Sequence, residues 1–158
     1  MLVERREQRL YADYNQFYVE DRDAAGDTGS LDFWTDEAFQ NKVAVVPGTV
    51  GIGTATYGYV CVHTELHDAS PSIDLAAWDH VTEAGLEITS GAVRVTGCLA
   101  DEGEDFAVAS GPHRVRCCHA DLAEASGTDE GTDWYIVQIW PAPLAPPIVL
   151  KYYSAEDI

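Results

Sequence analysis

Basic residues are scarce in this sequence. Its 158 residues include 9 Lys and Arg against 27 Asp and Glu, which gives a formal net charge of −18 at pH 7. Only Lys42 and Lys151 are lysines. Phosphate groups would repel such a chain, so free nucleic acid and an anionic membrane surface are unfavourable partners. Two interpretations of the acid remain: it serves solubility or a salty cytoplasm, or it forms a face that docks on a basic protein.

Long apolar runs are also missing. No stretch approaches the roughly 18–20 apolar residues that span a bilayer, and residues 1–9 carry charges where a signal peptide needs an apolar stretch. We therefore expect a cytoplasmic location and no membrane contact. Thiols stay reduced in that compartment, so we expect inert, mostly buried cysteines on strands and no cofactor. The four cysteines are Cys61, Cys98, Cys117 and Cys118.

Helix signals are few, and short segments of alternating apolar residues dominate. Thr35 or Asp36 could cap a short helical turn that buries Trp34 and Phe39. The segment 57–66 is the strongest strand, 134–140 is apolar enough to be central, and 148–153 is expected at an edge. The other predicted strands are 10–20, 43–46 with its hairpin partner 49–54, 77–89 interrupted at Gly85, 93–99 pairing back on 77–89, 106–109 and 113–121.

This spacing predicts an all-β fold, an antiparallel β-sandwich with at most one or two short helical turns. A flattened barrel is the alternative. The length fits one domain over residues 1–158, and no change of composition marks a second.

One segment has a metal-like composition. On a strand, His113, Cys117 and His119 share one face of the segment 113–121, and Cys61 and His63 share a face of 57–66. Cys61, His63, Cys117 and His119 could build a tetrahedral zinc site if the two strands were neighbours with those faces opposed. The spacing matches no zinc module, and ordinary packing of these side chains is the other interpretation.

Catalytic signals are weak. Carboxylates are so abundant that no acid–base pair stands out, and no serine lies in a nucleophile elbow. The sequence favours a binding role over catalysis. A small-molecule- or metal-binding protein, or an enzyme of unknown substrate, with an interior pocket lined by His63, His113 or His119, remains the alternative.

Acidic residues gather in two predicted loop regions. We interpret them as the rim of a face that binds a basic protein, because clustered carboxylates speed the encounter with such a partner; a solvated loop is the simpler interpretation. An exposed Trp or Tyr beside this acid would be a candidate hot spot. The proposed partner-binding residues are Asp101, Glu102, Glu104 and Asp105 in the first region, and Glu124, Asp129 and Glu130 in the second.

Four segments matter together: 13–18 (DYNQFY), 34–39 (WTDEAF), the hairpin 47–54 and the strand 134–140 (WYIVQIW). In order and spacing they resemble the competence protein J family, whose best-known member inhibits a DNA-entry nuclease. The resemblance implies a small β protein that binds a nuclease and blocks it. This chain departs from the pattern by an acidic insertion at 21–30 and an extended Pro-rich C-terminal part.

Overall fold

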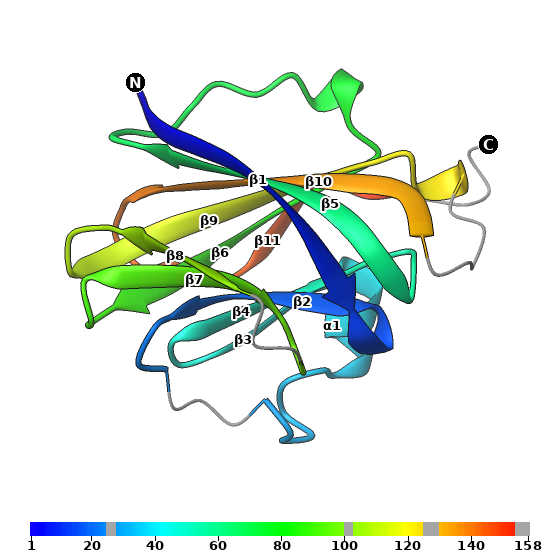
Figure 1. Ribbon diagram of the computed structural model, residues 1–158, viewed down its shortest axis with the longest axis horizontal. Helices are drawn as coiled ribbons and strands as arrows, with labels where there is room; N and C mark the ends of the chain where they lie inside the picture. The colour runs from blue at the N-terminus through cyan, green and yellow to red at the C-terminus, as the bar shows by residue number, and fades with distance from the viewer. Residues whose placement is uncertain (25–27, 100–102, 125–129, 154–158) are drawn as a thin grey trace.

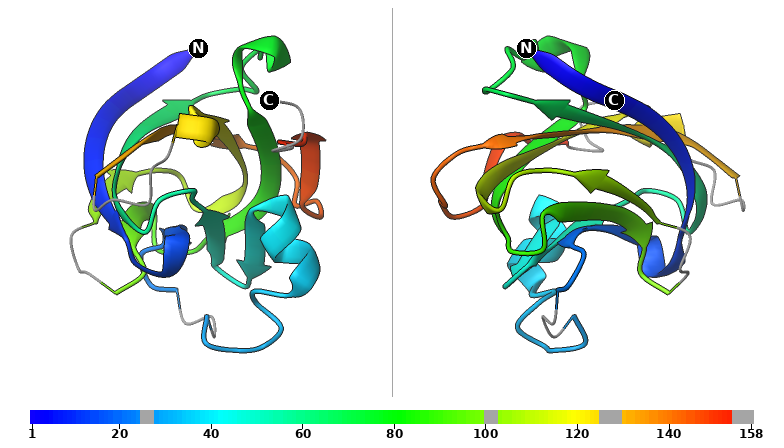
Figure 2. Two further views of the ribbon diagram at one scale, coloured as in Figure 1. Left: turned by 90° about the vertical axis from the view of Figure 1, so that its right-hand side faces the viewer. Right: turned by 60° about the vertical axis from the view of Figure 1, so that its left-hand side comes forward.

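The computed structural model describes residues 1–24, 28–99, 103–124 and 130–153, without the side chains of Glu124 and Glu130. Two β-sheets stack face to face (Figures 1 and 2), so the predicted sandwich is confirmed. The largest cluster of buried apolar side chains draws residues from both sheets, among them Val62 and Val137 from one and Phe17 and Val95 from the other. Among the described residues, no helix is long and apolar enough to cross a bilayer.

The six-stranded sheet holds the most apolar strand at its centre. The predicted central strand is β10, which lies between β5 and β9, and the predicted edge strand is β11; both expectations are confirmed. The β5–β10 pair is parallel, whereas the other pairs in this sheet are antiparallel. In spatial order the strands are β1 (Leu2–Ala12), β5 (Gly58–His67), β10 (Glu130–Pro141), β9 (Gly111–Ala120), β6 (His80–Ile88) and β11 (Ile148–Lys151).

The five-stranded sheet contains the predicted hairpin. In spatial order its strands are β3 (Val43–Val46), β4 (Thr49–Gly53), β2 (Gln16–Asp21), β7 (Ala92–Gly97) and β8 (Glu104–Ala107). The helical elements are α1 (Asp36–Asn41) and the 3-10 turns η1 (Asp13–Asn15), η2 (Leu75–Ala77) and η3 (Leu122–Glu124).

The single strand predicted over 10–20 is wrong. The chain leaves the six-stranded sheet at the end of β1, turns through η1, and enters the five-stranded sheet as β2. Tyr14 and Asn15 make this turn with φ of 56° and 60°, in the left-handed region. Neither glycine nor proline occurs at this break. Asparagine can take their place, because it tolerates the left-handed conformation and its side chain can hydrogen-bond to the nearby backbone.

Two further expectations need correction. Strand β6 runs unbroken through Gly85, where a Cβ would lie 2.9 Å from the carbonyl oxygen of Ala145; glycine here admits the Pro-rich connector. Strand β7 does not pair back on β6 but lies between β2 and β8 in the other sheet.

Helix α1 begins as the sequence predicts, since Thr35 Oγ1 accepts a hydrogen bond from the Ala38 amide at 3.1 Å. It does not bury Phe39, however, whose side chain is 62% exposed and leans on the half-buried Trp34. A six-residue helix has one inward face, and here Ala38 occupies it.

Strand β1 also closes the seam between the sheets. Gln8 Nε2 donates to the carbonyl of Val95 at 3.1 Å, and the Arg6 guanidinium lies 4.4 Å above the ring of Phe106. The charged N-terminal stretch is therefore an edge strand whose side chains reach β7 and β8.

Candidate docking surface

The first acidic region is paired with arginines where the structure describes it. Asp105 accepts a hydrogen bond from Arg94 Nε at 2.8 Å and lies 3.4 Å from Arg22 Nε. The bond from Arg94 is the main reason why the pKa of Asp105 is lowered. Glu104 is exposed and 3.7 Å from Arg6. The described carboxylates of the first acidic region therefore belong to a network of acidic and basic side chains. Asp101 and Glu102 lie outside the described residues.

The second acidic region is described only at its margins. Glu124 ends η3 and Glu130 begins β10, but their side chains, like Asp129, lie outside the described part of the chain. Asp133, which the sequence places beside this loop, is buried and accepts hydrogen bonds from the amides of Ala55 and Thr56. It anchors the connection between β4 and β5 and is not available to a partner.

The four side chains offered as zinc ligands do not come together. Strand β10 separates β5 from β9, so the two strands are not neighbours. Cys117 and His119 face the core, where His119 packs on Tyr135, whereas Cys61 and His63 lie on the outer face beside Trp134. The set Cys61, His63, Cys117 and His119 is therefore wrong as one site, because half of it lies on each side of the sheet.

Four tyrosines cluster where β1 ends and β5 begins, and we call them the tyrosine cluster: Tyr11, Tyr14, Tyr57 and Tyr59. Their rings meet edge to face, with centroid separations of 4.9 Å for Tyr11–Tyr59, 5.7 Å for Tyr14–Tyr57 and 6.3 Å for Tyr11–Tyr57. Tyr14 is 61% exposed and Tyr57 43% exposed. Edge-to-face pairs hold aromatic rings in defined positions, so this is an ordered aromatic surface.

The backbone under Tyr14 is strained and well tied. A left-handed conformation costs a residue such as Tyr14 roughly 1–2 kcal/mol. Asn15, which tolerates the conformation better, follows in the same region. Asn15 Nδ2 donates to the carbonyl of Ala55 at 3.3 Å, and the Thr54 amide donates to the carbonyl of Asn15 at 2.8 Å. Strain of this kind is concentrated at functional sites.

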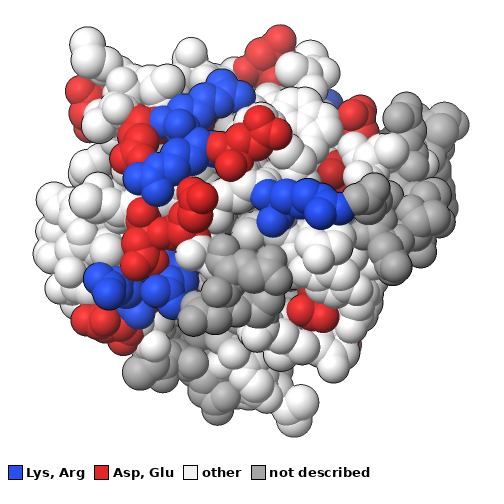
Figure 3. Space-filling model, viewed as in Figure 1, with Lys and Arg blue, Asp and Glu red and all other residues white. Residues whose placement is uncertain are grey.

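Described residues in or near each acid-bearing region approach the tyrosine cluster. Glu130 is the register partner of Tyr59, and Cys98, just beyond β7, donates to the carbonyl of Asp13 at 3.3 Å. The Arg9 guanidinium lies 3.8 Å above the ring of Tyr59. On this side of the molecule, basic side chains are interspersed with carboxylates (Figure 3).

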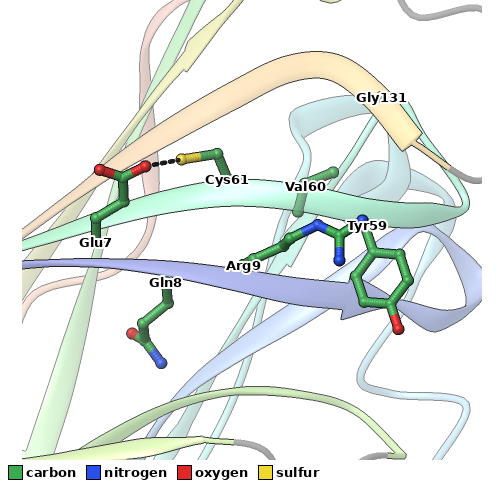
Figure 4. A pocket seen from close by; sticks show the side chains of 7 residues that line it. All are labelled: Glu7, Gln8, Arg9, Tyr59, Val60, Cys61 and Gly131. Carbon is green, nitrogen blue, oxygen red and sulfur yellow. Dashed lines mark hydrogen bonds between the residues drawn. The ribbon is translucent and has the colours of Figure 1, made fainter.

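A groove of about 580 Å³ opens beside the cluster (Figure 4). Polar side chains from β1 and β5 line it, including Glu7, Arg9 and Tyr59. The sequence does not identify the tyrosine cluster as a surface, because the exposure of its rings depends on the turn at Tyr14. The available signal was the asparagine that follows Tyr14 inside an otherwise strand-like run.

No protein-family model matches the chain, and no curated protein does. In structure, the chain is a two-sheet sandwich that resembles two known proteins. One is ComJ from Bacillus subtilis, the inhibitor of the DNA degrading activity of NucA: the TM-score is 0.71 at 19% identity, over 90% of this chain and 99% of ComJ. The other is the crocagin biosynthetic gene J protein, with a TM-score of 0.55 at 20% identity, over 89% and 98% of the respective chains. The predicted resemblance to competence protein J is confirmed as a shared fold.

Proposed function

We propose that this protein binds a nuclease and inhibits it. The observation that supports the proposal most is the extent of the match to ComJ, which spans nearly all of both chains. ComJ inhibits the DNA degrading activity of NucA.

Charge supports a basic partner. A nuclease must attract phosphate, so its DNA channel carries a positive potential, which a chain of net charge −18 complements. Contacts between such surfaces speed association more than they strengthen the final complex. The carboxylates proposed to meet the partner are Asp101, Glu102, Glu104, Asp105, Glu124, Asp129 and Glu130.

The tyrosine cluster supplies the anchor that carboxylates lack. Tyrosine is enriched among the few residues that carry most of the energy of an interface. A cation over such a ring contributes about 0.5–1 kcal/mol at an exposed site and about 2 when water is excluded. Arg9 over Tyr59 shows that the ring face accepts a guanidinium in this geometry. The exposed rings of Tyr14 and Tyr57 would receive arginines of the partner in the same way.

Inhibition of DNA cleavage tests the proposal. The purified protein is titrated into nucleases with basic DNA channels, NucA among them, and plasmid cleavage is followed at about 50 and about 300 mM salt. We expect cleavage to slow as the protein approaches equimolar ratio, and the effect to weaken in the higher salt. If no such nuclease is slowed and none binds in a salt-sensitive manner, the proposal is wrong.

Matched variants locate the surface. Asp101→Asn with Glu102→Gln removes two charges from the proposed rim, and Asp32→Asn with Glu87→Gln removes two exposed charges elsewhere. The first pair is expected to slow association, and the second to leave it nearly unchanged. Equal effects from the two pairs would show that only net charge matters.

A further inference from the structure

Three side chains with metal-ligand chemistry meet on the outer face of the β1–β5 pair. Cys61 and His63 are two residues apart on β5, so they share a face, and Glu7 is the register partner of His63 on β1. Cys61 Sγ lies 3.3 Å from Glu7 Oε1 and 3.6 Å from His63 Nε2. Their three ligand atoms all lie within 4.8 Å of one another.

We propose that Glu7, Cys61 and His63 bind a zinc ion, with the fourth coordination position open to solvent. Thiolate, imidazole and carboxylate are the three ligand types that zinc accepts, and softer sulfur disfavours magnesium and calcium. Zinc bonds of about 2.3 Å to sulfur and about 2.0–2.1 Å to nitrogen and oxygen place tetrahedral ligand atoms about 3.3–3.6 Å apart. The separations of Cys61 Sγ from Glu7 Oε1 and from His63 Nε2 already match that range, and the Glu7 and His63 ligand atoms lie within 4.8 Å of each other.

The metal-free state of the cluster fits a site that loads by losing protons. The pKa of Cys61 is raised to about 11, mainly by burial and to a smaller extent by the hydrogen bond to Glu7 and the charge of Glu7. The free thiol is therefore neutral and donates a hydrogen bond to the Glu7 carboxylate. A divalent cation reverses this preference, because it stabilises the thiolate and is attracted to Glu7. Binding therefore releases the thiol proton, and the affinity is expected to rise with pH.

Arg5 is the group that opposes binding. Its Nη2 lies 3.5 Å from His63 Nδ1, and since a guanidinium only donates, Nδ1 accepts and Nε2 keeps its proton. Zinc on Nε2 requires the other tautomer and the departure of Arg5. The Arg5 side chain is 48% exposed and its Nη1 already lies 3.2 Å from Glu65, so it has a place to go. Arg9, the register partner of Cys61, is the other cation nearby, and its guanidinium lies over Tyr59.

Cobalt substitution tests the site without reference to inhibition. The whole protein is titrated with Co²⁺, followed by absorbance, and then with Zn²⁺ in competition with a chromophoric chelator. We expect one tetrahedral cobalt per chain with a thiolate-to-cobalt charge-transfer band, and displacement by one equivalent of zinc. Removal of Arg5 as Arg5→Gln is expected to tighten zinc binding by severalfold.

Thiol variants decide the assignment. Cys61→Ser is expected to abolish the charge-transfer band, and Glu7→Gln or His63→Gln to weaken zinc binding at least tenfold, each with an unchanged circular dichroism spectrum. Cys98→Ser, which removes another half-buried thiol that lies on neither β1 nor β5, is the control and should bind as wild type does. No bound metal, or a spectrum that survives Cys61→Ser, would overturn the proposal, and neither result would bear on nuclease inhibition.

Discussion

Glu83 lies between two buried arginines on the outer face of the six-stranded sheet, and its replacement by glutamine should destabilise the protein severely. Arg114 Nε donates to Glu83 Oε1 at 3.1 Å and Arg116 Nε to Oε2 at 2.9 Å. Both arginines are buried, and their remaining donors hold other segments: Arg114 bonds the carbonyl of Ala145 at 2.9 Å and Arg116 that of Pro71 at 2.9 Å. Glu83→Gln therefore leaves two guanidinium charges in place with no carboxylate between them.

The expected cost follows from that geometry. Breaking a buried ion pair by removal of one partner costs about 3–5 kcal/mol, against a total stability of about 5–15 kcal/mol for an ordinary domain. In a chain of this length, that loss lowers the melting temperature by about 10 °C. Urea unfolding checks it, and the fluorescence of Trp140 is a local probe, because the Arg116 guanidinium lies 4.8 Å above its ring.

Two comparisons make this prediction refutable. Glu87→Gln alters an exposed carboxylate on the same strand and should stay within about 0.5 kcal/mol of wild type. Replacement of all three charged groups by apolar residues of similar size should recover most of the loss, because no buried charge then lacks a partner. If Glu83→Gln unfolds within about 0.5 kcal/mol of wild type, the charges are not held as the structure indicates.

Three further predictions concern acid stability and the strained turn. His80 is neutral when folded, because burial lowers its pKa to about 4 from 6.5 and Nδ1 accepts the Tyr153 amide at 3.0 Å. The unfolded chain binds the extra proton, so stability should fall by up to about 1.4 kcal/mol per unit as the pH drops from about 6.5 towards 4, and His80→Phe should reduce that slope in urea unfolding. Burial raises the pKa of Asp21, but four hydrogen bonds from Ser90 and Thr89 outweigh burial and lower this pKa to about 2. The contribution of Asp21 to folding stability is therefore present above about pH 4 and lost as the pH falls through 2. Asp21→Ala should cost about 1–3 kcal/mol at pH 7 and much less in thermal melts at pH 2. Tyr14→Gly should relieve left-handed strain and leave the melting temperature equal or higher, yet weaken nuclease inhibition; a parallel loss of both would show that Tyr14 is structural.

Most strands could be predicted from the sequence, because each carries its own alternation of apolar residues. Strand β1 is the exception, since the sequence predicts its residues 2–9 only as a charged beginning. The prediction of the β3–β4 hairpin and of the central position of β10 required only the local sequence pattern and the apolar character of the strand. Pairings between distant segments left no such signal: nothing local indicates that β10 runs parallel to β5, or that β7 joins β2. The break at Tyr14 was missed because neither glycine nor proline marks it.

Site residues were harder to predict, because the sequence gives the number of charged residues but does not show which of them are paired. Asp105 forms an ion pair with Arg94, and the buried carboxylate of Asp133 accepts hydrogen bonds from backbone amides. Cys61 and His63 were correctly placed together on one face, but the carboxylate beside them comes from β1. Glu7 lies in a stretch that the sequence offered only as a charged beginning.

The hydrogen bonds between Asn15 and the segment at Thr54 and Ala55 tie together the two places where the chain crosses between sheets at this end of the molecule. Tyr14 and Tyr57 lie on these two crossings, so the backbone under neither ring can move far without disturbing both sheets. The backbone of the tyrosine cluster is therefore preorganised: its conformational entropy is given up during folding, before any binding. If the cluster binds a nuclease as proposed, its free and bound forms should differ by little more than side-chain rotamers, because a stiff surface tolerates few changes in the shape of what it binds.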